Sequence, residues 1–172
     1  YEMYSVYTTY HHPGLGSNVG IVVLDTPADA SELLANSGYG DTRYHFAVSD
    51  TAAHIASNLG GLNARVTYVD SIEVSDSNEL SISYSQYSAD TNALAKITGS
   101  YSLSVNTVSE ANVVNLAKDS HVTQITLAAN QTLTYEEYTA KDVAGKLVNT
   151  DLTITNVTAS ELPNVAELSA VA

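Results

Sequence analysis

Apolar and polar residues alternate near the start of the chain, a pattern typical of a β-strand with one buried face. The alternation covers residues 3–10, whose β-branched and aromatic side chains favour a strand. Residues 19–24 are instead continuously apolar between polar flanks, which is typical of a strand buried on both faces. A turn at Pro13-Gly14 separates the two strands, and a helix over residues 26–36 is predicted after the second. Residues 1–46 are therefore predicted to form a β-rich segment.

From about residue 47 onward, helical and strand patterns alternate with a period of about 50 residues. Two segments, Tyr84–Ser109 and Tyr135–Thr158, both begin with Tyr-x-x-Tyr-[Ser/Thr]-Ala, continue into an Ala-rich helical pattern and end in an alternating strand (LSVNTVS and LTITNVT). Strict alternation of helix and strand predicts parallel strands joined by crossover helices. Repetition at this period predicts stacked coils and not a closed barrel. We therefore predict an α/β fold: a solenoid-like stack of helix–strand repeats with a parallel sheet over residues 47–172, capped by the N-terminal β segment of residues 1–46.

The repeat assigns equivalent positions to residues that lie far apart in the sequence. Four residues stand where helix N-caps belong, namely Asp50, Ser88, Ser109 and Thr139. Four apolar residues are predicted to occupy one core position on adjacent parallel strands, namely Ile72, Leu103, Ile125 and Ile154. The tyrosines of the two Tyr-x-x-Tyr motifs are predicted to pack at strand-to-helix corners, and a ligand-binding ladder of tyrosines is the alternative.

Charge and composition restrict the partners of the chain. Lys and Arg number 6 against 19 Asp and Glu, for a net charge of −13. Nucleic-acid binding needs a basic cluster, which the sequence lacks, and anionic membrane surfaces are disfavoured for the same reason. Membrane insertion is not expected either, because no apolar run approaches the ~20 residues of a membrane span. Self-association or a larger parent chain are the expected partners, since unpaired strand edges invite association and the first residues resemble the middle of a strand.

The same composition bears on localisation. Only 15% of residues are charged, so Ser, Thr, Asn and Tyr must supply the polar surface, as is common in secreted and cell-surface proteins. The chain has no Cys, which excludes disulfides, thiolate metal sites and cysteine nucleophiles. We therefore expect a secreted or cell-surface protein.

Two stretches carry a resemblance to a known repeat. VSDTAAHIASNLGGLN (residues 48–63) and LSISYSQYSADTNALAKITGSYSLSV (residues 80–105) resemble a helix–strand repeat of large bacterial secreted proteins, and the resemblance covers about residues 47–158. It implies an architecture, export through a type I channel and calcium-rich surroundings. It does not imply a calcium-filled roll, because the glycine-and-aspartate nonapeptide is missing. The expected function is a non-enzymatic extracellular repeat module with a structural, adhesive or assembly role.

The opening stretch HHPGLGSNVGIVVLDTP (residues 11–27) resembles the segment of trypsin-like serine proteases that carries the triad aspartate. Asn18 falls at the place of that aspartate. An Asn there presents the wrong hydrogen-bonding pattern, and a Gly-Asp-Ser-Gly-Gly nucleophile motif is missing. The alternative function is thus a fragment of a secreted trypsin-like serine protease that is inactive as it stands, and the chain is expected not to be an enzyme.

Metal and cofactor chemistry has one candidate site. The acidic loop of residues 70–79 could bind calcium through the side-chain oxygens of Asp70, Asp76, Asn78 and Glu79, and a solvated loop is the alternative. The five histidines are scattered, and His11 and His12 are adjacent and would point to opposite faces of a strand, so they do not form a zinc site. A small-ligand or haem carrier that uses Tyr and His is the second alternative function. No cofactor other than calcium is expected.

Overall fold

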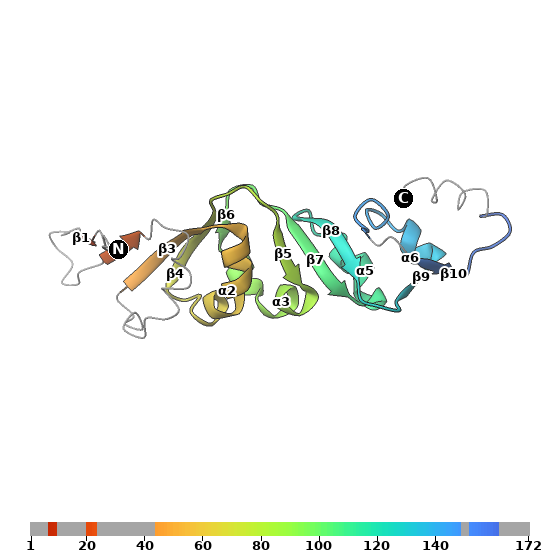
Figure 1. The fold of residues 1–172 in the computed structure, drawn as a ribbon, viewed down its shortest axis with the longest axis horizontal. Coiled ribbons are helices and arrows are strands. Elements are labelled where there is room, and N and C mark those ends of the chain that lie inside the picture. Colours follow the sequence, from red (N-terminus) through yellow and green to blue (C-terminus); the bar gives the residue numbers. More distant parts are fainter. Residues whose placement is uncertain (1–6, 10–19, 24–43, 149–151, 162–172) are drawn as a thin grey trace. The chain divides into compact units, whose positions relative to one another are not determined.

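The computed structural model describes residues 7–9, 20–23, 44–148 and 152–161 (Figure 1). The chain is a mixed α/β protein with parallel sheets, which confirms the predicted fold class at that level. Its contacts divide into two compact units, Tyr1–Ser81 with Ser85–Ser102, and Ile82–Tyr84 with Leu103–Ala172. The predicted division between residues 46 and 47 stays a prediction. No helix in the described part of the chain is long and apolar enough to span a membrane.

The first unit contains a five-stranded sheet of order β1-β2-β3-β4-β6. Its strands are β1 (Tyr7–Thr9), β2 (Gly20–Val23), β3 (Tyr44–Asp50), β4 (Val69–Val74) and β6 (Ile97–Thr98). β1 and β2 pair antiparallel, whereas β2–β3, β3–β4 and β4–β6 pair parallel. Strands β1 and β2 thus confirm the two predicted N-terminal strands. The predicted turn and helix of this region, together with Asn18 and the adjacent His11 and His12, lie outside the described residues.

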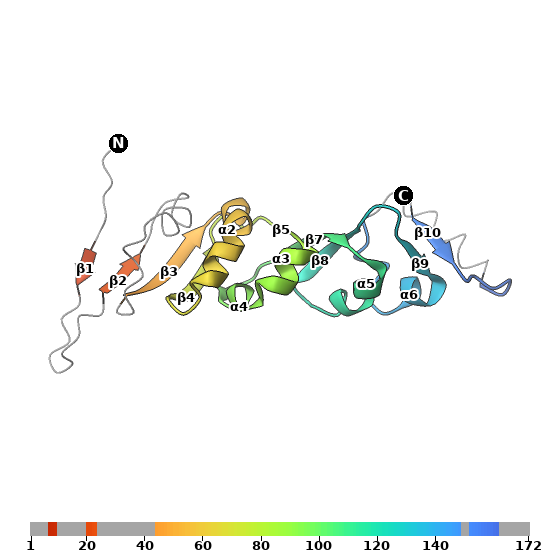
Figure 2. The same cartoon turned by 90° about the horizontal axis from the view of Figure 1, so that it is seen from below.

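Helix α2 (Ala52–Ala64) is the crossover that joins the parallel strands β3 and β4. Its buried residues recur at helical spacing along one face, namely Ala52, Ile55, Ala56, Leu59 and Leu62. This face packs on β4, whose Val69 and Ile72 are also buried. Figure 2 shows α2 beside the short helix α4 (Thr91–Leu94), with which it is in contact.

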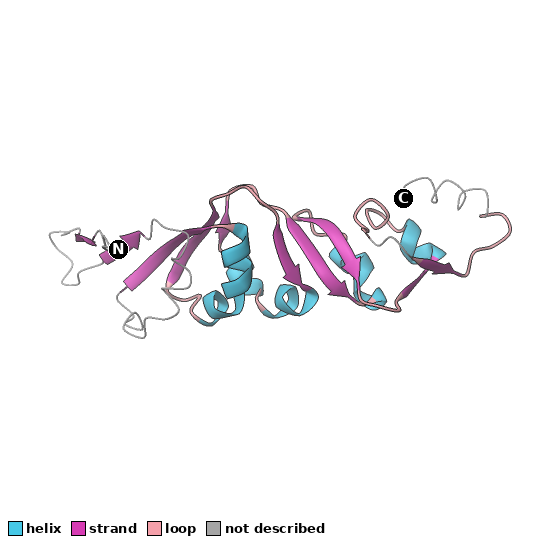
Figure 3. Ribbon diagram, in the orientation of Figure 1, coloured by secondary structure: helices cyan, strands magenta, loops and turns pink. Residues whose placement is uncertain are grey.

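The second unit also contains a helix that joins two parallel strands (Figure 3). Its sheet has the order β5-β7-β8, from β5 (Leu80–Ser83), β7 (Leu103–Val108) and β8 (Val122–Leu127), and α5 (Glu110–Leu116) joins the parallel strands β7 and β8. The strands β9 (Thr132–Thr134) and β10 (Thr153–Thr155) form a separate parallel pair. Core residues come from α5 and from both sheets, for example Val113, Ile125 and Leu133.

Three of the four predicted core positions are buried, and the four do not share one sheet. Ile72, Leu103 and Ile125 are at most 1% exposed, whereas Ile154 is half-buried. Leu103 and Ile125 lie on the adjacent strands β7 and β8, as predicted, but they are not at equivalent positions, because Leu103 pairs with Val122 and Ile125 pairs with Val105. Ile72 lies in the sheet of the first unit and Ile154 in the β9–β10 pair, so the prediction of four adjacent strands is wrong. The reason is that short strands not expected from the sequence, β5 and β9, each begin a new set of strand pairs.

Three of the four predicted N-caps are wrong, and only Ser109 is the N-cap of its helix, α5. Helix α2 is capped by Thr51 and not by Asp50, because the Thr51 hydroxyl accepts a hydrogen bond from His54 N. The other two helices begin earlier than expected, directly after a short strand. Ser88 therefore lies inside α3 (Tyr84–Ala89), and Thr139 is the last residue of α6 (Tyr135–Thr139).

Helix α6 begins early because Thr134 and Glu137 form a capping box. Glu137 N donates to the Thr134 hydroxyl at 3.2 Å, and Thr134 N donates to Glu137 Oε2 at 2.8 Å. Tyr84 and Tyr135 consequently follow β5 and β9 without a gap, which places both tyrosine motifs at strand-to-helix corners as predicted.

Candidate functional site

A hollow of about 420 Å³ opens on the first unit, and it contains most of the predicted calcium ligands. Small residues on the first half of α2 line it, namely Ala52, Ala53 and Ala56. Its polar lining comes from Ser57 of α2, from the turn between β4 and β5, from Ser81 of β5 and from Gln86 of α3; the turn contributes Asp76, Asn78 and Glu79. We call this hollow the polar groove. The fourth predicted ligand, Asp70, is an exposed residue of β4 and does not line the groove.

Asp76 is held in place by three hydrogen bonds from N–H donors. Its Oδ1 accepts from Ala52 N at 3.0 Å and from Asn78 N at 3.3 Å, and its Oδ2 accepts from Asn78 Nδ2 at 2.6 Å. The hydrogen bond from Ala52 is the main cause that lowers the pKa of Asp76 below its ordinary value. The carboxylate therefore stays ionised and stabilises the N-terminus of α2, where the helix dipole favours negative charge.

The groove thus brings Asp76, Asn78 and Glu79 together, but the bonds to Asp76 explain its position without a metal ion. Across the described ranges, no three His, Asp or Glu side chains are grouped so that they could hold a metal. Calcium in this groove stays a prediction.

A second carboxylate lies at the same end of α2. Asp50, the last residue of β3, is 1% exposed, and its Oδ1 accepts from Thr51 N at 2.7 Å and lies 3.0 Å from His54 Nδ1. The His54 side chain is half-exposed. Reasoning from the sequence missed this pair, although the spacing Asp-x-x-x-His places both residues on one side of a helix start. Both contacts to Asp50 close the first turn of α2, so we assign the pair a structural role.

The second unit has an equivalent arrangement at the start of α5. Gln131 Oε1, from the turn between β8 and β9, accepts a hydrogen bond from Glu110 N at 3.0 Å. A hollow of about 280 Å³ is lined by Leu127, the same turn and Thr153. At the other end of α5, Lys146 Nζ donates to Ala117 O at 2.6 Å and to Asp119 O at 2.8 Å. This lysine therefore binds the carbonyl groups at the helix C-terminus.

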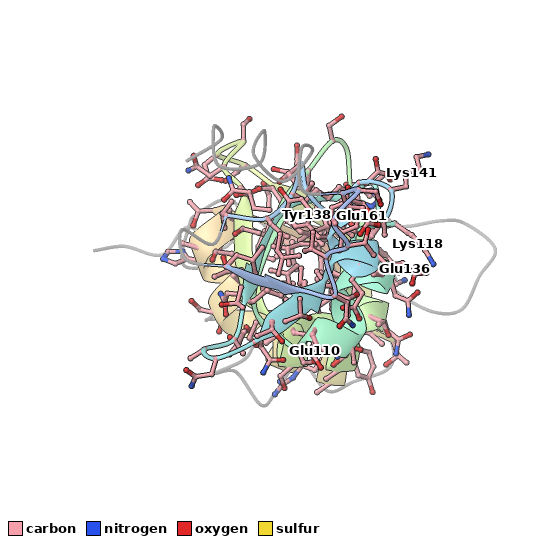
Figure 4. The ribbon with its side chains drawn as sticks, turned by 90° about the vertical axis from the view of Figure 1, so that its right-hand side faces the viewer. Glu110, Lys118, Glu136, Tyr138, Lys141 and Glu161 are labelled. Atoms are coloured by element: carbon pink, nitrogen blue, oxygen red, sulfur yellow. The ribbon has the colours of Figure 1, made fainter. Side chains whose placement is uncertain are left out.

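Charged side chains of the second unit lie mainly on its surface. Figure 4 labels Glu110, Lys118 and Lys141, all of which are exposed, and it shows Lys118 and Lys141 extending away from the ribbon. The four motif tyrosines at positions 84, 87, 135 and 138 are half-buried, which fits their predicted packing role. Their binding of a ligand stays a prediction, as does the haem carrier.

Comparison of the chain with protein-family models, with curated proteins and with solved structures gave no match.

Proposed function

We propose that the chain is a non-enzymatic extracellular repeat module, with a structural, adhesive or assembly role in a secreted bacterial protein. One observation carries the proposal. The order strand, helix, strand, turn, short strand, tyrosine helix occurs twice along the chain, from β3 to α3 and from β7 to α6, and equivalent hydrogen bonds stabilise it each time. Repetition of a whole hydrogen-bonding scheme is expected of stacked repeats, which bury their apolar faces against their neighbours.

The start of the main helix is the first repeated feature. In each unit, the first helical N–H donates to a side-chain oxygen from the turn that follows the next strand. The distance is 3.0 Å from Ala52 N to Asp76 Oδ1 and 3.0 Å from Glu110 N to Gln131 Oε1. The turn itself also recurs, because Ser77 and Asn130 have φ of 55° and 61°.

The backbone pairing of the strands is the second repeated feature. Ser75 N donates to Asp50 O at 2.8 Å, and Ala128 N donates to Val108 O at 2.8 Å. The buried isoleucine of each second strand donates to the carbonyl of a lysine that follows the tyrosine helix: Ile72 N to Lys96 O at 2.8 Å, and Ile125 N to Lys146 O at 2.7 Å. Equivalent bonds therefore recur at separations of 50 to 58 residues, which supports a repeat whose period is imperfect.

The N-terminal strands support the predicted cap. β2 pairs parallel with β3 and continues the sheet, whereas β1 pairs antiparallel with β2. A parallel β2–β3 pair does not suit the antiparallel barrel expected of a trypsin-like protease. The protease alternative therefore rests on the sequence resemblance at Asn18, which lies outside the described residues.

Duplication of one period tests the proposal. We would insert a second copy of residues 107–155 after Thr155, so that β10 continues into a further unit. A repeat module should fold with unchanged far-UV circular dichroism per residue and a higher urea midpoint, because each added unit contributes one more stabilising interface. An insert of the same composition in scrambled order is the control.

A duplicated segment that stays unfolded and is degraded by a protease as fast as the scrambled insert would contradict the repeat. Localisation is tested separately, by protease digestion of intact producing cells. The proposal expects the chain to be cleaved there without cell lysis.

A further inference from the structure

A buried carboxylate in the first unit has no role in the scheme described so far. Asp90, between α3 and α4, is 7% exposed. It is the N-cap residue of α4, yet its side chain makes no capping hydrogen bond. With the other described residues its carboxylate forms no hydrogen bond or ion pair. Such a group is unusual, because a buried charge is normally paired.

The surface that faces this carboxylate is the backbone of α2 at Gly60. A Cβ added to Gly60 would lie 3.7 Å from Asp90 Oδ2 and 3.8 Å from Oδ1. Gly60 is in the interior of the helix, so its own N–H belongs to the helical ladder and is not a donor for Asp90. Figure 2 shows how closely α2 and α4 lie in this region.

The titratable groups on the neighbouring elements do not neutralise Asp90. On α2, His54 is bonded to Asp50, and Arg65 is the C-cap. Helix α3 carries Tyr84 and Tyr87, α4 carries no titratable residue, and Lys96 lies beyond its end. None of these groups is paired with Asp90. Burial consequently raises the pKa of Asp90 above its ordinary value.

Residues on either side of Asp90 form hydrogen bonds with α2. Asn63 Nδ2 donates to Ala89 O at 3.2 Å, and Ala93 N donates to Asn63 Oδ1 at 3.1 Å. Gln86 Nε2 donates to Ala56 O at 2.9 Å, and Asp90 N donates to Gln86 O at 2.8 Å. Asp90 therefore occupies the centre of the contact between α2 and the α3–α4 segment, and the same segment provides Gln86 to the polar groove.

We propose that Asp90 is an acid-strengthened clasp: the α3–α4 segment holds α2 more tightly when the Asp90 carboxyl carries a proton than when it is ionised. A neutral carboxyl is desolvated at small cost beside Gly60, whereas an unpaired anion is not. The proton can exchange with the solvent. In the described part of the chain, every fully buried side-chain oxygen has a hydrogen-bond partner. The Asp90 oxygens have no such partner there, so they must keep some contact with water.

The sign of the effect follows from linkage. Because the folded state raises the pKa of Asp90, it binds this proton more tightly than the unfolded chain does. The stabilisation is complete below the unfolded pKa and is lost as the pH rises through the folded pKa. The α3–α4 segment, which provides Gln86 to the polar groove, is thus held most tightly against α2 in acid.

Native-state hydrogen exchange tests the clasp. Two amides report on it directly, since Leu94 N donates to Asp90 O and Ala95 N donates to Thr91 O. After correction for intrinsic exchange rates, we expect their opening constant to rise between about pH 4 and about pH 7, tenfold for each pKa unit that folding adds. In Asp90→Asn the opening constant should be independent of pH and below the wild-type value at neutral pH. Asp70→Asn, on the exposed part of β4, should keep the wild-type slope.

A second variant covers the case in which Asp90→Asn fails to fold. In Gly60→Ala the added methyl group lies at contact distance from both carboxylate oxygens and removes more water, so the slope should become steeper. In parallel, the ¹³C shift of the Asp90 carboxyl should titrate above 3.8, its ordinary pKa. The clasp is refuted if Asp90→Asn retains the wild-type slope, or if the carboxyl titrates at or below 3.8.

Discussion

Thr107 has a backbone conformation that its side chain opposes. Its φ is 59°, in the left-handed region that β-branched residues rarely adopt, and it lies at the irregularity between Val105 and Val108 in the β7–β8 pairing. Asn156, with φ 58°, has the same place after β10, and Asn tolerates this region far better than Thr.

Replacement of Thr107 by Asn should therefore raise the free energy of unfolding, by about 1 kcal/mol, because the left-handed conformation costs a β-branched residue of that order. Urea denaturation measures the change. The matched control is Asn156→Thr, which should lower the free energy of unfolding by a similar amount. If Thr107→Asn and Asn156→Thr have the same free energy of unfolding, backbone strain at Thr107 does not affect stability.

Asp76 has a pH dependence opposite in sign to that of Asp90. Its pKa is lowered in the folded state, so its contribution to stability is complete above the unfolded value of 3.8 and is lost as the pH falls through the folded value. We expect Asp76→Asn to lower Tm at neutral pH, because the N-terminus of α2 loses a charged acceptor. The two melting curves should converge in acid. Asp70→Asn is again the control, and a Tm difference that persists undiminished in acid would exclude the charge as its cause.

At the scale of elements, the alternation of strand and helix could be predicted because the apolar spacing changes clearly between the two patterns. The parallel pairing followed from that alternation. The starts of α3 and α6 could not be predicted in the same way, because β5 and β9 are 4 and 3 residues long and leave no room for a recognisable strand pattern. The signal that was available, the capping box of Thr134 and Glu137, places the start of α6 correctly.

The candidate site was predictable in part. The turn after β4 was identified by its acidity, and the groove contains three of its four proposed ligands. The bond between Ala52 and Asp76 was not predictable, because it joins residues that are 24 positions apart. Asp90 was missed for a similar reason, since its carboxylate lies beside Gly60 of another helix.

The equivalent strands β4 and β8 should respond alike to truncation of their central isoleucines. Ile72 and Ile125 are both 0% exposed. Either change to Ala should cost about 2–5 kcal/mol in the free energy of unfolding, through lost burial and the cavity that remains. Ile154→Ala should cost less, because Ile154 is only half-buried. Chemical denaturation of the three variants is the measurement, and an Ile72 cost close to that of Ile154 would contradict the assigned equivalence.

At the scale of the whole molecule, the net charge of −13 favours cations over anionic partners. We expect at most a weak stabilisation by calcium, because the oxygens of Asp76 already accept hydrogen bonds. A ligand adds about 2.7 kcal/mol to the free energy of unfolding when its concentration is 100 times its Kd, and a weak site adds less. Tm should therefore rise only slightly between chelator and millimolar calcium, and Glu79→Gln should abolish the rise. An unchanged Tm would remove calcium from the polar groove.

The hydrogen bonds at the starts of α2 and α5 also determine when each helix start can form during synthesis. The acceptor for Ala52 N lies 24 residues downstream, and the acceptor for Glu110 N lies 21 residues downstream. During synthesis, each helix start consequently waits for a short stretch of new chain to emerge, and for nothing further. A growing chain can thus close the start of α2 before the residues of α5 have been made.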